Sequence, residues 1–264
     1  MENAYLPWAS EILEIIQHTD IEYTFRMAYK GAVIPGQFFE VSIPKYGECP
    51  ISVSGIGDGF IDLTIRRVGK VTDELHKVLI GQKFFMRGPY GNGFEMKNFE
   101  NKELIITAGG SGLAPVKGII DKINTEINCV KDFHLLVGFK SPEDILFKSE
   151  LETWRNNGLG QTLTVDSAGE DYTGNVGLVT QYVPELKIQK MDDLAVVIVG
   201  PPMMMKFTVK AFLDRGVPEE KIWVSYERKM HCGLGKCGGC KMDDTYICLD
   251  GPVFNYVDAK KLFD

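Results

Sequence analysis

Cysteine is the residue type whose spacing points most directly to chemistry in this chain of 264 residues. Four of the six cysteines lie between residues 232 and 248, while Cys49 and Cys129 stand alone. Disulfide frameworks belong mainly to small secreted proteins, and this chain is neither small nor visibly secreted. The cluster therefore predicts a metal site. Its four expected ligands are Cys232, Cys237, Cys240 and Cys248.

The order of the four cysteines narrows the kind of metal site. The first three follow the pattern Cys-x4-Cys-x2-Cys, which is the ligand spacing of a plant-type 2Fe–2S cluster. The fourth comes after seven more residues, and we expect it on a short hairpin through Tyr246 and Ile247. Glycines between the cysteines would let the backbone wrap closely around inorganic sulfides. A structural zinc loop is the alternative, although zinc sites usually carry two separated Cys-x2-Cys pairs and this chain has one.

Two turns rich in glycine and proline each follow an apolar strand in the middle of the chain. The run Leu104–Thr107 leads into glycines and a helix start, where close backbone approach and free N–H groups suit a pyrophosphate. The run Leu194–Val199 ends in a rigid Gly-Pro-Pro turn. Either turn alone could be structural, and a methionine run is more often core, but together they predict a dinucleotide site. The residues expected there are Gly109, Gly110, Ser111, Gly112, Leu113, Ala114, Pro115, Gly200, Pro201, Pro202 and Met203.

A third candidate site lies nearer the N-terminus, in the segments 49–54 and 65–72. The second segment places two arginines, a glycine and a threonine at the end of a strand, a combination that can hold a phosphate. An adjacent pair of arginines is more often a solvated surface, so this signal alone does not define a site.

The rhythm of apolar runs divides the chain into three parts. Residues 1–98 carry short strand-like runs, such as 37–43 and 60–66, separated by turn residues, which predicts an antiparallel β-barrel. Residues 99–226 alternate strand-like with helical patterns, which predicts a parallel sheet covered on both faces. Residues 227–264 are too short for a core of their own and need the cysteines as a staple. The expected fold is a β-barrel, an α/β domain and a small iron–sulfur tail.

Composition and charge exclude several classes of protein. Hydrophobic residues make up 44% and charged residues 25% of the chain, which is average for globular proteins. The net charge of −7 offers no overall attraction to nucleic acid or anionic lipid. No apolar run approaches the ~18 residues of a membrane-spanning helix, and residues 1–5 lack the basic and apolar stretches of a signal peptide. We therefore expect a cytoplasmic protein with no membrane and no nucleic-acid partner.

These motifs occur together, and in this order, in one known superfamily. The segments Pro-Ile-Ser-Val-Ser (50–54), Arg-Arg-Val-Gly-Lys-Val-Thr (66–72), Gly-Gly-Ser-Gly-Leu-Ala-Pro (109–115) and Gly-Pro-Pro-Met (200–203), followed by the cysteine tail, resemble the ferredoxin-NADP reductase superfamily. Within it, the chain most closely resembles the B subunits of anaerobic sulfite reductases, over nearly its whole length. The γ subunits of cytoplasmic sulfhydrogenases and the electron-transfer subunit of dihydroorotate dehydrogenase are related but less similar.

The resemblance implies three cofactors, which are FAD on the barrel, NADH or NADPH on the α/β domain, and a 2Fe–2S cluster on the tail. Hydride transfer to the flavin would precede single-electron steps to the cluster, and no catalytic acid or base is expected. Many members of the superfamily place an arginine before the Pro-x-Ser segment to hold the flavin pyrophosphate. This chain has Cys49 there, so Arg66 or Arg67 would take that role. The residues implied to bind FAD are Pro50, Ile51, Ser52, Val53, Ile65, Arg66, Gly69, Val71 and Thr72.

The resemblance also implies partner subunits. The chain lacks a second set of cysteines for a sirohaem and its partner cluster, so sulfite would be reduced elsewhere. We expect a hetero-oligomer with an iron–sulfur electron-carrier subunit and a sirohaem sulfite reductase subunit. The same module serving a hydrogenase or another redox complex is an alternative, and so is a zinc-stapled, non-catalytic nucleotide-binding protein. NADH is expected rather than NADPH because Asp166 would repel a 2′-phosphate, whereas Lys140 argues the other way.

Overall fold

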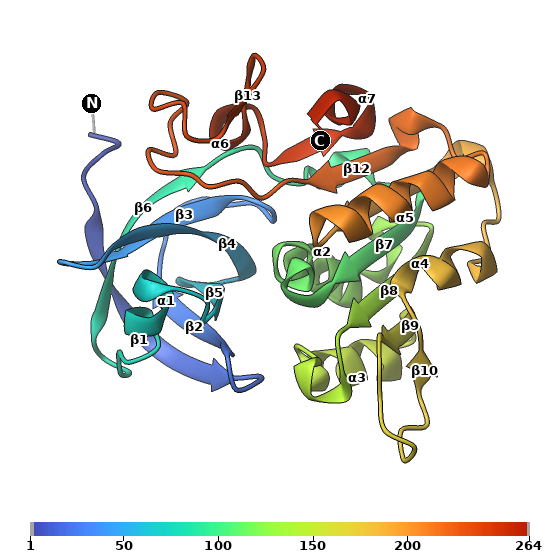
Figure 1. The fold of residues 1–264 in the computed structure, drawn as a ribbon, viewed down its shortest axis with the longest axis horizontal. Helices are drawn as coiled ribbons and strands as arrows, with labels where there is room; N and C mark the ends of the chain where they lie inside the picture. Colours follow the sequence, from blue (N-terminus) through green and yellow to red (C-terminus); the bar gives the residue numbers. More distant parts are fainter. Residues whose placement is uncertain (1–2, 263–264) are drawn as a thin grey trace. The chain divides into compact units, whose positions relative to one another are not determined.

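The computed structural model describes residues 3–262, so the first two residues of the N-terminal stretch considered above lie outside it. The chain forms two compact units (Figure 1). Residues 1–94 and 226–253 make up the first, which we call the barrel unit, and residues 95–225 and 254–264 make up the second, the sheet unit.

The barrel unit is built on a closed barrel of six strands in the order β1-β2-β5-β4-β3-β6. All six neighbouring strand pairs of this barrel are antiparallel, as the short runs separated by turn residues predicted. One short helix, α1 (Lys70–Leu75), follows β5. The strands are β1 (Trp8–Gln17), β2 (Glu22–Ala28), β3 (Phe38–Ile43), β4 (Gly47–Gly57), β5 (Phe60–Arg66) and β6 (Lys83–Tyr90).

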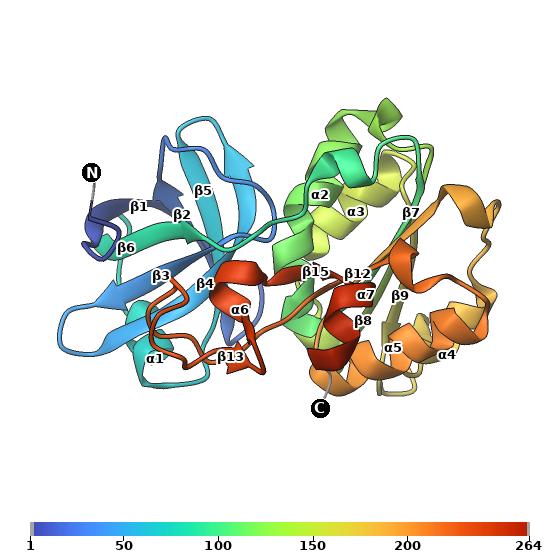
Figure 2. The ribbon, with the colours of Figure 1, turned by 90° about the horizontal axis from the view of Figure 1, so that it is seen from above.

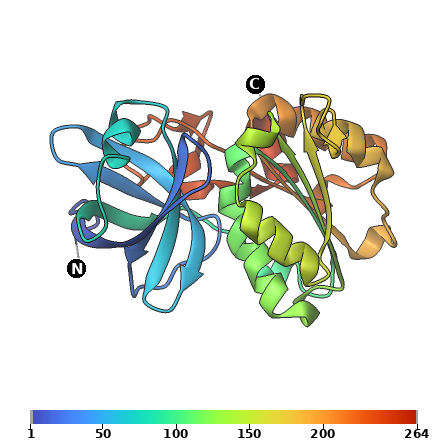
Figure 3. The same cartoon turned by 90° about the horizontal axis from the view of Figure 1, so that it is seen from below.

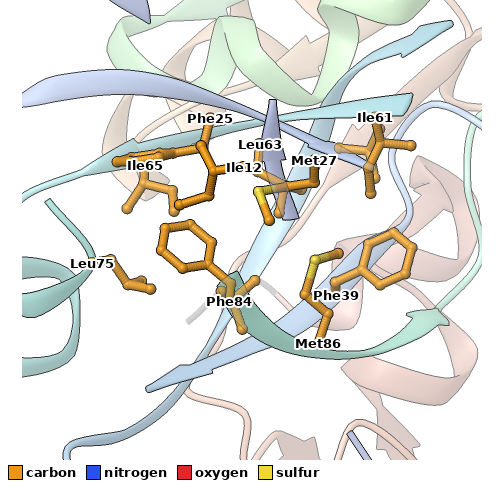
Figure 4. Packing of buried hydrophobic residues seen from close by; sticks show 12 residues of the cluster. Ile12, Phe25, Met27, Phe39, Ile61, Leu63, Ile65, Leu75, Phe84 and Met86 are labelled. Carbon is orange, nitrogen blue, oxygen red and sulfur yellow. The ribbon is translucent and has the colours of Figure 1, made fainter. Parts of the chain in front are cut away.

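Alternate residues of these strands point into the barrel and form its core (Figure 4). Side chains alternate between the two faces of a strand, so an alternating pattern buries one set and leaves the other outside. Phe84 and Met86 on β6 face the core in this way, while Phe85 between them does not belong to it. The core side chains labelled in Figure 4 are Ile12, Phe25, Met27, Phe39, Ile61, Leu63, Ile65, Leu75, Phe84 and Met86.

The sheet unit contains a seven-stranded sheet in the order β10-β9-β8-β7-β11-β12-β15. The pairs from β10 to β12 are parallel, as predicted from the alternation of strands and helices. Strand order reverses at β7, since β8 and β9 lie on one side of it and β11 and β12 on the other. The strands are β7 (Glu103–Gly109), β8 (Asp132–Phe139), β9 (Gly160–Val165), β10 (Asn175–Val176), β11 (Leu194–Val199), β12 (Ile222–Ser225) and β15 (Val253–Asn255).

Helices cover both faces of this sheet, which explains why every residue of β7 and β11 is buried. Figure 2 shows α2 (Ala114–Thr125) and α3 (Lys148–Asn156) on one face, and α4 (Val179–Tyr182) and α5 (Pro202–Asp214) on the other. In Figure 3 the helices α2 and α3 lie in front of the sheet. Short 3-10 helices connect the elements. They are Met96–Asn98, Gly110–Leu113, Ile127–Cys129, Pro142–Asp144, Val183–Glu185, Met191–Asp193, Glu219–Lys221 and Lys260–Leu262.

The C-terminal part of the chain is shared between the two units. Residues 226–253 group with the barrel, and the residues after them group with the sheet, where β15 is an edge strand. The hairpin β13 (Lys241–Met242) and β14 (Thr245–Tyr246) ends before Ile247, so Cys248 lies in helix α6 (Ile247–Asp250) rather than on the hairpin itself. Helix α7 (Tyr256–Ala259) follows β15. Within the described residues, no helix is both long and apolar enough to cross a membrane.

Candidate functional site

The four clustered cysteines lie together in the barrel unit as free thiols. Their thiols interact in two pairs, Cys232 with Cys237 and Cys240 with Cys248. Cys240 and Cys248 are buried, whereas Cys237 is exposed and Cys232 is partly exposed. The two pairs therefore differ in their access to solvent.

Backbone N–H groups point at the sulfur atoms of these cysteines. The N–H groups of Leu234 and Lys236 donate to Cys232 Sγ at 3.4 Å, and that of Cys237 donates at 3.5 Å. The N–H group of Gly235 donates to Cys248 Sγ at 3.1 Å. Burial opposes ionisation of Cys232, but the backbone hydrogen bonds win and lower the pKa of its thiol to about 6. Cys232 therefore favours the thiolate, which is the form that binds metal. Burial has the opposite effect at Cys248, where it raises the pKa of the thiol to about 12.

Glycine is required in this loop for two reasons. Gly233, Gly235 and Gly238 have positive φ values between 67° and 80°, a region that side chains disfavour. A Cβ atom on Gly233 would also lie 2.6 Å from the Tyr90 ring, and one on Gly235 would lie 2.7 Å from Leu249. The loop can therefore fold over its sulfur atoms only with glycine at these positions.

The paired thiols suit a binuclear cluster. Each iron of a 2Fe–2S cluster takes two protein ligands, so two pairs of thiols supply the four that are needed. Among residues 3–262, no three His, Cys, Asp or Glu side chains converge closely enough to hold a single metal ion. The ring of inward N–H donors adds the hydrogen bonds that anionic sulfur requires. Cys232, Cys237, Cys240 and Cys248 are thus the residues that could hold such a cluster.

The predicted flavin segments lie on neighbouring strands of the barrel. Residues 49–52 of β4 stay partly exposed although their strand has neighbours on both sides. The segment 66–70 after β5 is exposed, and Gly69 has open space where a Cβ atom would stand. Thr72 closes the turn, because its Oγ1 accepts hydrogen bonds from the N–H groups of Val68 and Gly69 at 3.0 Å. The segment therefore offers an ordered, accessible backbone to a phosphate.

Val53 and Ile65 are placed differently from the rest of the predicted FAD residues. Both are buried members of the barrel core, while Val71 is partly buried against it. They support the site from within the barrel core. Among the remaining predicted positions, Pro50, Ile51 and Ser52 are partly exposed, Arg66 and Gly69 are exposed, and Thr72 is buried.

Cys49 is unsuited to replace an arginine as a phosphate ligand. Its side chain packs against the barrel core. Burial, together with the negative charges of Glu40 and Glu48, raises the pKa of its thiol to about 12. Cys49 therefore stays neutral. Arg66 is about half-exposed, with Nε 3.7 Å from Glu22 Oε1, and its charge remains accessible.

The two predicted nucleotide turns meet at the carboxyl ends of β7 and β11. A Cβ atom on Gly112 would lie 2.6 Å from the carbonyl oxygen of Val199 and 2.7 Å from the Cα atom of Gly200. A Cβ atom on Gly200 would in turn lie 3.2 Å from the backbone nitrogen of Gly109. Strand order reverses between β7 and β11, and such a switch point is where open α/β sheets bind ligands.

The predicted nucleotide residues divide into a buried and an accessible set. Gly110 has a φ of 53° with open space around it, and Ser111 beside it is partly exposed. The segment 112–115 is buried and begins helix α2 inside the unit. Pro201, Pro202 and Met203 are exposed at the start of α5. The accessible set could contact a dinucleotide, and the buried set shapes the turn.

The sequence analysis missed four polar residues beneath the cysteine loop. They are Glu40 on β3, Glu48 on β4, and Arg87 and Tyr90 on β6, and we call them the polar cluster. Charged residues are rarely fully buried, yet Glu40 is 1% and Arg87 5% exposed. The only signal in the sequence is a charged residue inside an otherwise apolar strand.

Comparison with known proteins extends this picture. Residues 106–210 match the oxidoreductase NAD-binding domain family, and residues 227–259 match the iron–sulfur cluster binding domain of dihydroorotate dehydrogenase B. The chain is 36% identical to the sulfhydrogenase 2 γ subunit of Pyrococcus furiosus, over 97% of each chain. It is 33% identical to a probable dihydroorotate dehydrogenase B (NAD(+)) electron transfer subunit of Methanothermobacter thermautotrophicus, over 96% of this chain and 91% of that one.

A solved structure shares the fold. An NADH-dependent reduced ferredoxin-NADP oxidoreductase, studied for flavin-based electron bifurcation, superimposes with a TM-score of 0.78 at 24% identity, over 94% of this chain and 88% of that one. The fold is thus an antiparallel β-barrel followed by an α/β domain, as in that structure, and residues 227–259 form the C-terminal iron–sulfur binding region. The chain belongs to the family of sulfhydrogenase γ subunits and dihydroorotate dehydrogenase electron-transfer subunits, which are oxidoreductase subunits.

Proposed function

We propose that this protein takes electrons in pairs from NADH and releases them singly to partner subunits. The observation that carries the proposal is the loop of four free thiols with inward N–H donors, folded on the same compact unit as the barrel. When bound, FAD supplies two-electron chemistry with the nicotinamide, and a 2Fe–2S cluster supplies one-electron chemistry with the partner. Residues 1–98, 99–226 and 227–264 would carry the flavin, nucleotide and cluster sites.

The chain's own residues bind and orient these groups. Gly110 and Ser111 offer backbone N–H groups to a pyrophosphate at the switch point of the sheet. Pro50, Ile51 and Ser52 line the flavin, and the turn at Gly69 approaches its phosphates. Arg66 or Arg67 supplies the positive charge that Cys49 lacks. No side chain is required to move a proton in the reaction.

NADH is the proposed donor. Asp166 follows β9 directly and is exposed, so its carboxylate would repel the 2′-phosphate of NADPH. Its backbone N–H donates to the carbonyl oxygen of Phe139 at 2.8 Å, which ties Asp166 to the end of β8. Lys140 follows Phe139 and brings a positive charge to the same edge.

The proposed partners are an iron–sulfur electron-carrier subunit and a sirohaem sulfite reductase subunit in a cytoplasmic hetero-oligomer. The six cysteines are four in the loop and two isolated ones, so sulfite reduction must take place on another chain. A hydrogenase partner is the second candidate, and the 36% identity to a sulfhydrogenase γ subunit favours it.

Anaerobic purification tests this proposal. We expect flavin and 2Fe–2S absorbance bands, bleaching of the flavin by NADH, and co-purification of the partner. Cys237→Ser should lose iron, while Cys129→Ser, which changes a cysteine far from the loop in sequence, should keep it. Colourless, iron-free protein would refute the function, and the co-purifying chain decides between a sirohaem subunit and a hydrogenase.

A further inference from the structure

Arg87 is the central residue of the polar cluster, and all five of its N–H donors have partners. It lies on β6 with its side chain only 6% exposed. Nε donates to Glu48 Oε2 at 3.0 Å and Nη2 to Glu48 Oε1 at 2.6 Å, which forms a bidentate pair. Nη2 also donates to the carbonyl oxygen of His231 at 2.7 Å. Nη1 donates to the carbonyl oxygen of Cys232 at 2.5 Å and to Tyr90 Oη at 3.2 Å.

These contacts join two segments that are far apart in the sequence. Glu48 stands immediately before residues 49–53, the proposed flavin segment, and Cys232 is the first proposed cluster ligand. Tyr90 supports the junction, because its ring fills the space next to Gly233. The guanidinium of Arg87 therefore joins the backbone at 231–232 to the barrel strands.

The charge of Arg87 is maintained in this buried position. Burial disfavours the charged form, but the hydrogen bonds to Glu48 and Tyr90 outweigh it and raise the pKa of Arg87 above its usual value. A second carboxylate, Glu40, is 1% exposed and has no hydrogen-bond partner for either oxygen. The guanidinium is therefore a fixed positive charge directly behind the first cysteine of the loop.

We propose that Arg87 is a positioning residue for the iron–sulfur cluster, which fixes the Cys232 end of the loop against the flavin strand and favours reduction of the cluster through its positive charge. This inference rests on the proposed function. A positive charge stabilises an added electron, so loss of the charge makes the cluster harder to reduce. Loss of the two carbonyl contacts frees the loop and exposes the iron to chelators.

A purely structural role predicts a different behaviour, and the chain contains a matched example. Arg26 on β2 forms a bidentate pair with Asp62 on β5, at 2.8 and 3.0 Å, and stacks over Phe60. The hydrogen bonds of Arg26 within residues 3–262 go to barrel strands, to Asp62 on β5 and Glu14 on β1. Arg26→Gln is therefore the control for loss of a partly buried barrel ion pair.

The experiment compares wild type, Arg87→Gln, Arg87→Lys and Arg26→Gln, each purified anaerobically with its cofactors. In Arg87→Gln we expect the equilibrium between oxidised and reduced cluster to shift about tenfold toward the oxidised form, or about 59 mV for one electron. Iron release to a chelator should be several-fold faster. Arg87→Lys keeps the positive charge but cannot form the bidentate hydrogen bonds of the guanidinium. The reduction potential of the cluster should therefore stay near the wild-type value, while iron release should be as fast as in Arg87→Gln. Flavin bleaching by NADH should be unchanged in all four.

Each outcome supports or overturns the proposal. If Arg87→Gln has the potential and iron-release rate of Arg26→Gln, Arg87 is an ordinary structural residue. If Arg87→Gln fails to fold, wild-type iron release in Arg87→Lys overturns the proposal. Wild-type protein without a flavin but with a cluster refutes the proposed function and still allows the potentials to be compared. Wild-type protein without iron refutes both.

Discussion

Glu40→Gln should make the stability of the barrel unit to unfolding fall less as the pH rises. The Glu40 carboxyl is buried beneath the cysteine loop, and neither of its oxygens has a hydrogen-bond partner. Burial, which outweighs the attraction of Arg87, raises its pKa from an ordinary 4.5 to about 7, and the charges of Glu48 and Cys232 act in the same direction as burial. The folded protein therefore holds this proton more tightly than the unfolded chain does.

The sign and size of the effect follow from this difference. Between pH 4.5 and 7 the unfolded chain loses the proton while the folded protein keeps it, so stability falls as pH rises through this window and then levels off. One pKa unit corresponds to about 1.4 kcal/mol, and the gap therefore amounts to about 3 kcal/mol above pH 7. Glutamine has a similar shape and no such proton, so Glu40→Gln should escape this loss.

Anaerobic urea unfolding at pH 5 and pH 8 measures the effect. From pH 5 to pH 8 the difference in unfolding free energy between variant and wild type should move by about 2.5 kcal/mol in favour of Glu40→Gln, because part of the loss has already occurred at pH 5. Any cost in stability of burying the glutamine amide is the same at both pH values, so it cancels when the two differences are compared. Ser10→Ala, which removes a buried hydroxyl that donates to the carbonyl oxygen of Ala28 at 2.8 Å, is the control and should show a difference independent of pH. A difference for Glu40→Gln that is also independent of pH would refute the reasoning.

Three further predictions concern the sheet unit. Gly112→Ala places a Cβ atom 2.6 Å from the carbonyl oxygen of Val199, so the two turns must separate. We expect thermal unfolding to show a loss of about 2 kcal/mol or more in stability, and titration to show weaker NADH binding. An unchanged NADH affinity would contradict the proposed site. Thr208→Val removes a fully buried hydroxyl that has no hydrogen-bond partner. In the same thermal unfolding assay, stability should therefore stay equal or rise by about 1 kcal/mol. A clear loss of stability would show that the hydroxyl has a hydrogen-bond partner in solution. Asp166→Ser should narrow the preference for NADH over NADPH in steady-state kcat/KM by about tenfold, or about 1.4 kcal/mol, and an unchanged ratio would remove Asp166 from the site.

Much of the fold could be predicted because its signals are local. Apolar runs such as Phe60–Arg66 and Leu194–Val199 became strands where they were expected, since burial on one or both faces leaves its pattern in consecutive residues. The four cysteines of the loop could also be singled out from the sequence, because they lie within 17 consecutive residues, 232–248. The predicted position of Cys248 on the hairpin was wrong, because Ile247 is buried and begins a helix that contains Cys248.

The polar cluster could not be predicted because the barrel register creates it. Glu40 faces both Pro50 and Arg87 across neighbouring strands, and these pairings are not encoded in any short segment. The contact between Arg87 and Cys232 spans 145 positions of the sequence. Arg87 alone resembles any charged residue within a strand, and only the folded chain reveals that a second segment covers it.

The discontinuous barrel unit has a consequence for biosynthesis. Its second stretch, 226–253, leaves the ribosome only after the whole of 95–225 has been made. Until then Arg87 and Glu40 on the nascent barrel lack their cover, and the cysteines that would receive iron have not been translated. A premature stop codon near residue 226 would leave all six barrel strands and most of the sheet unit, but it would remove the segment that covers Arg87 and Glu40. Cellular quality control would then meet exposed charged residues in the first part of the protein to be synthesised.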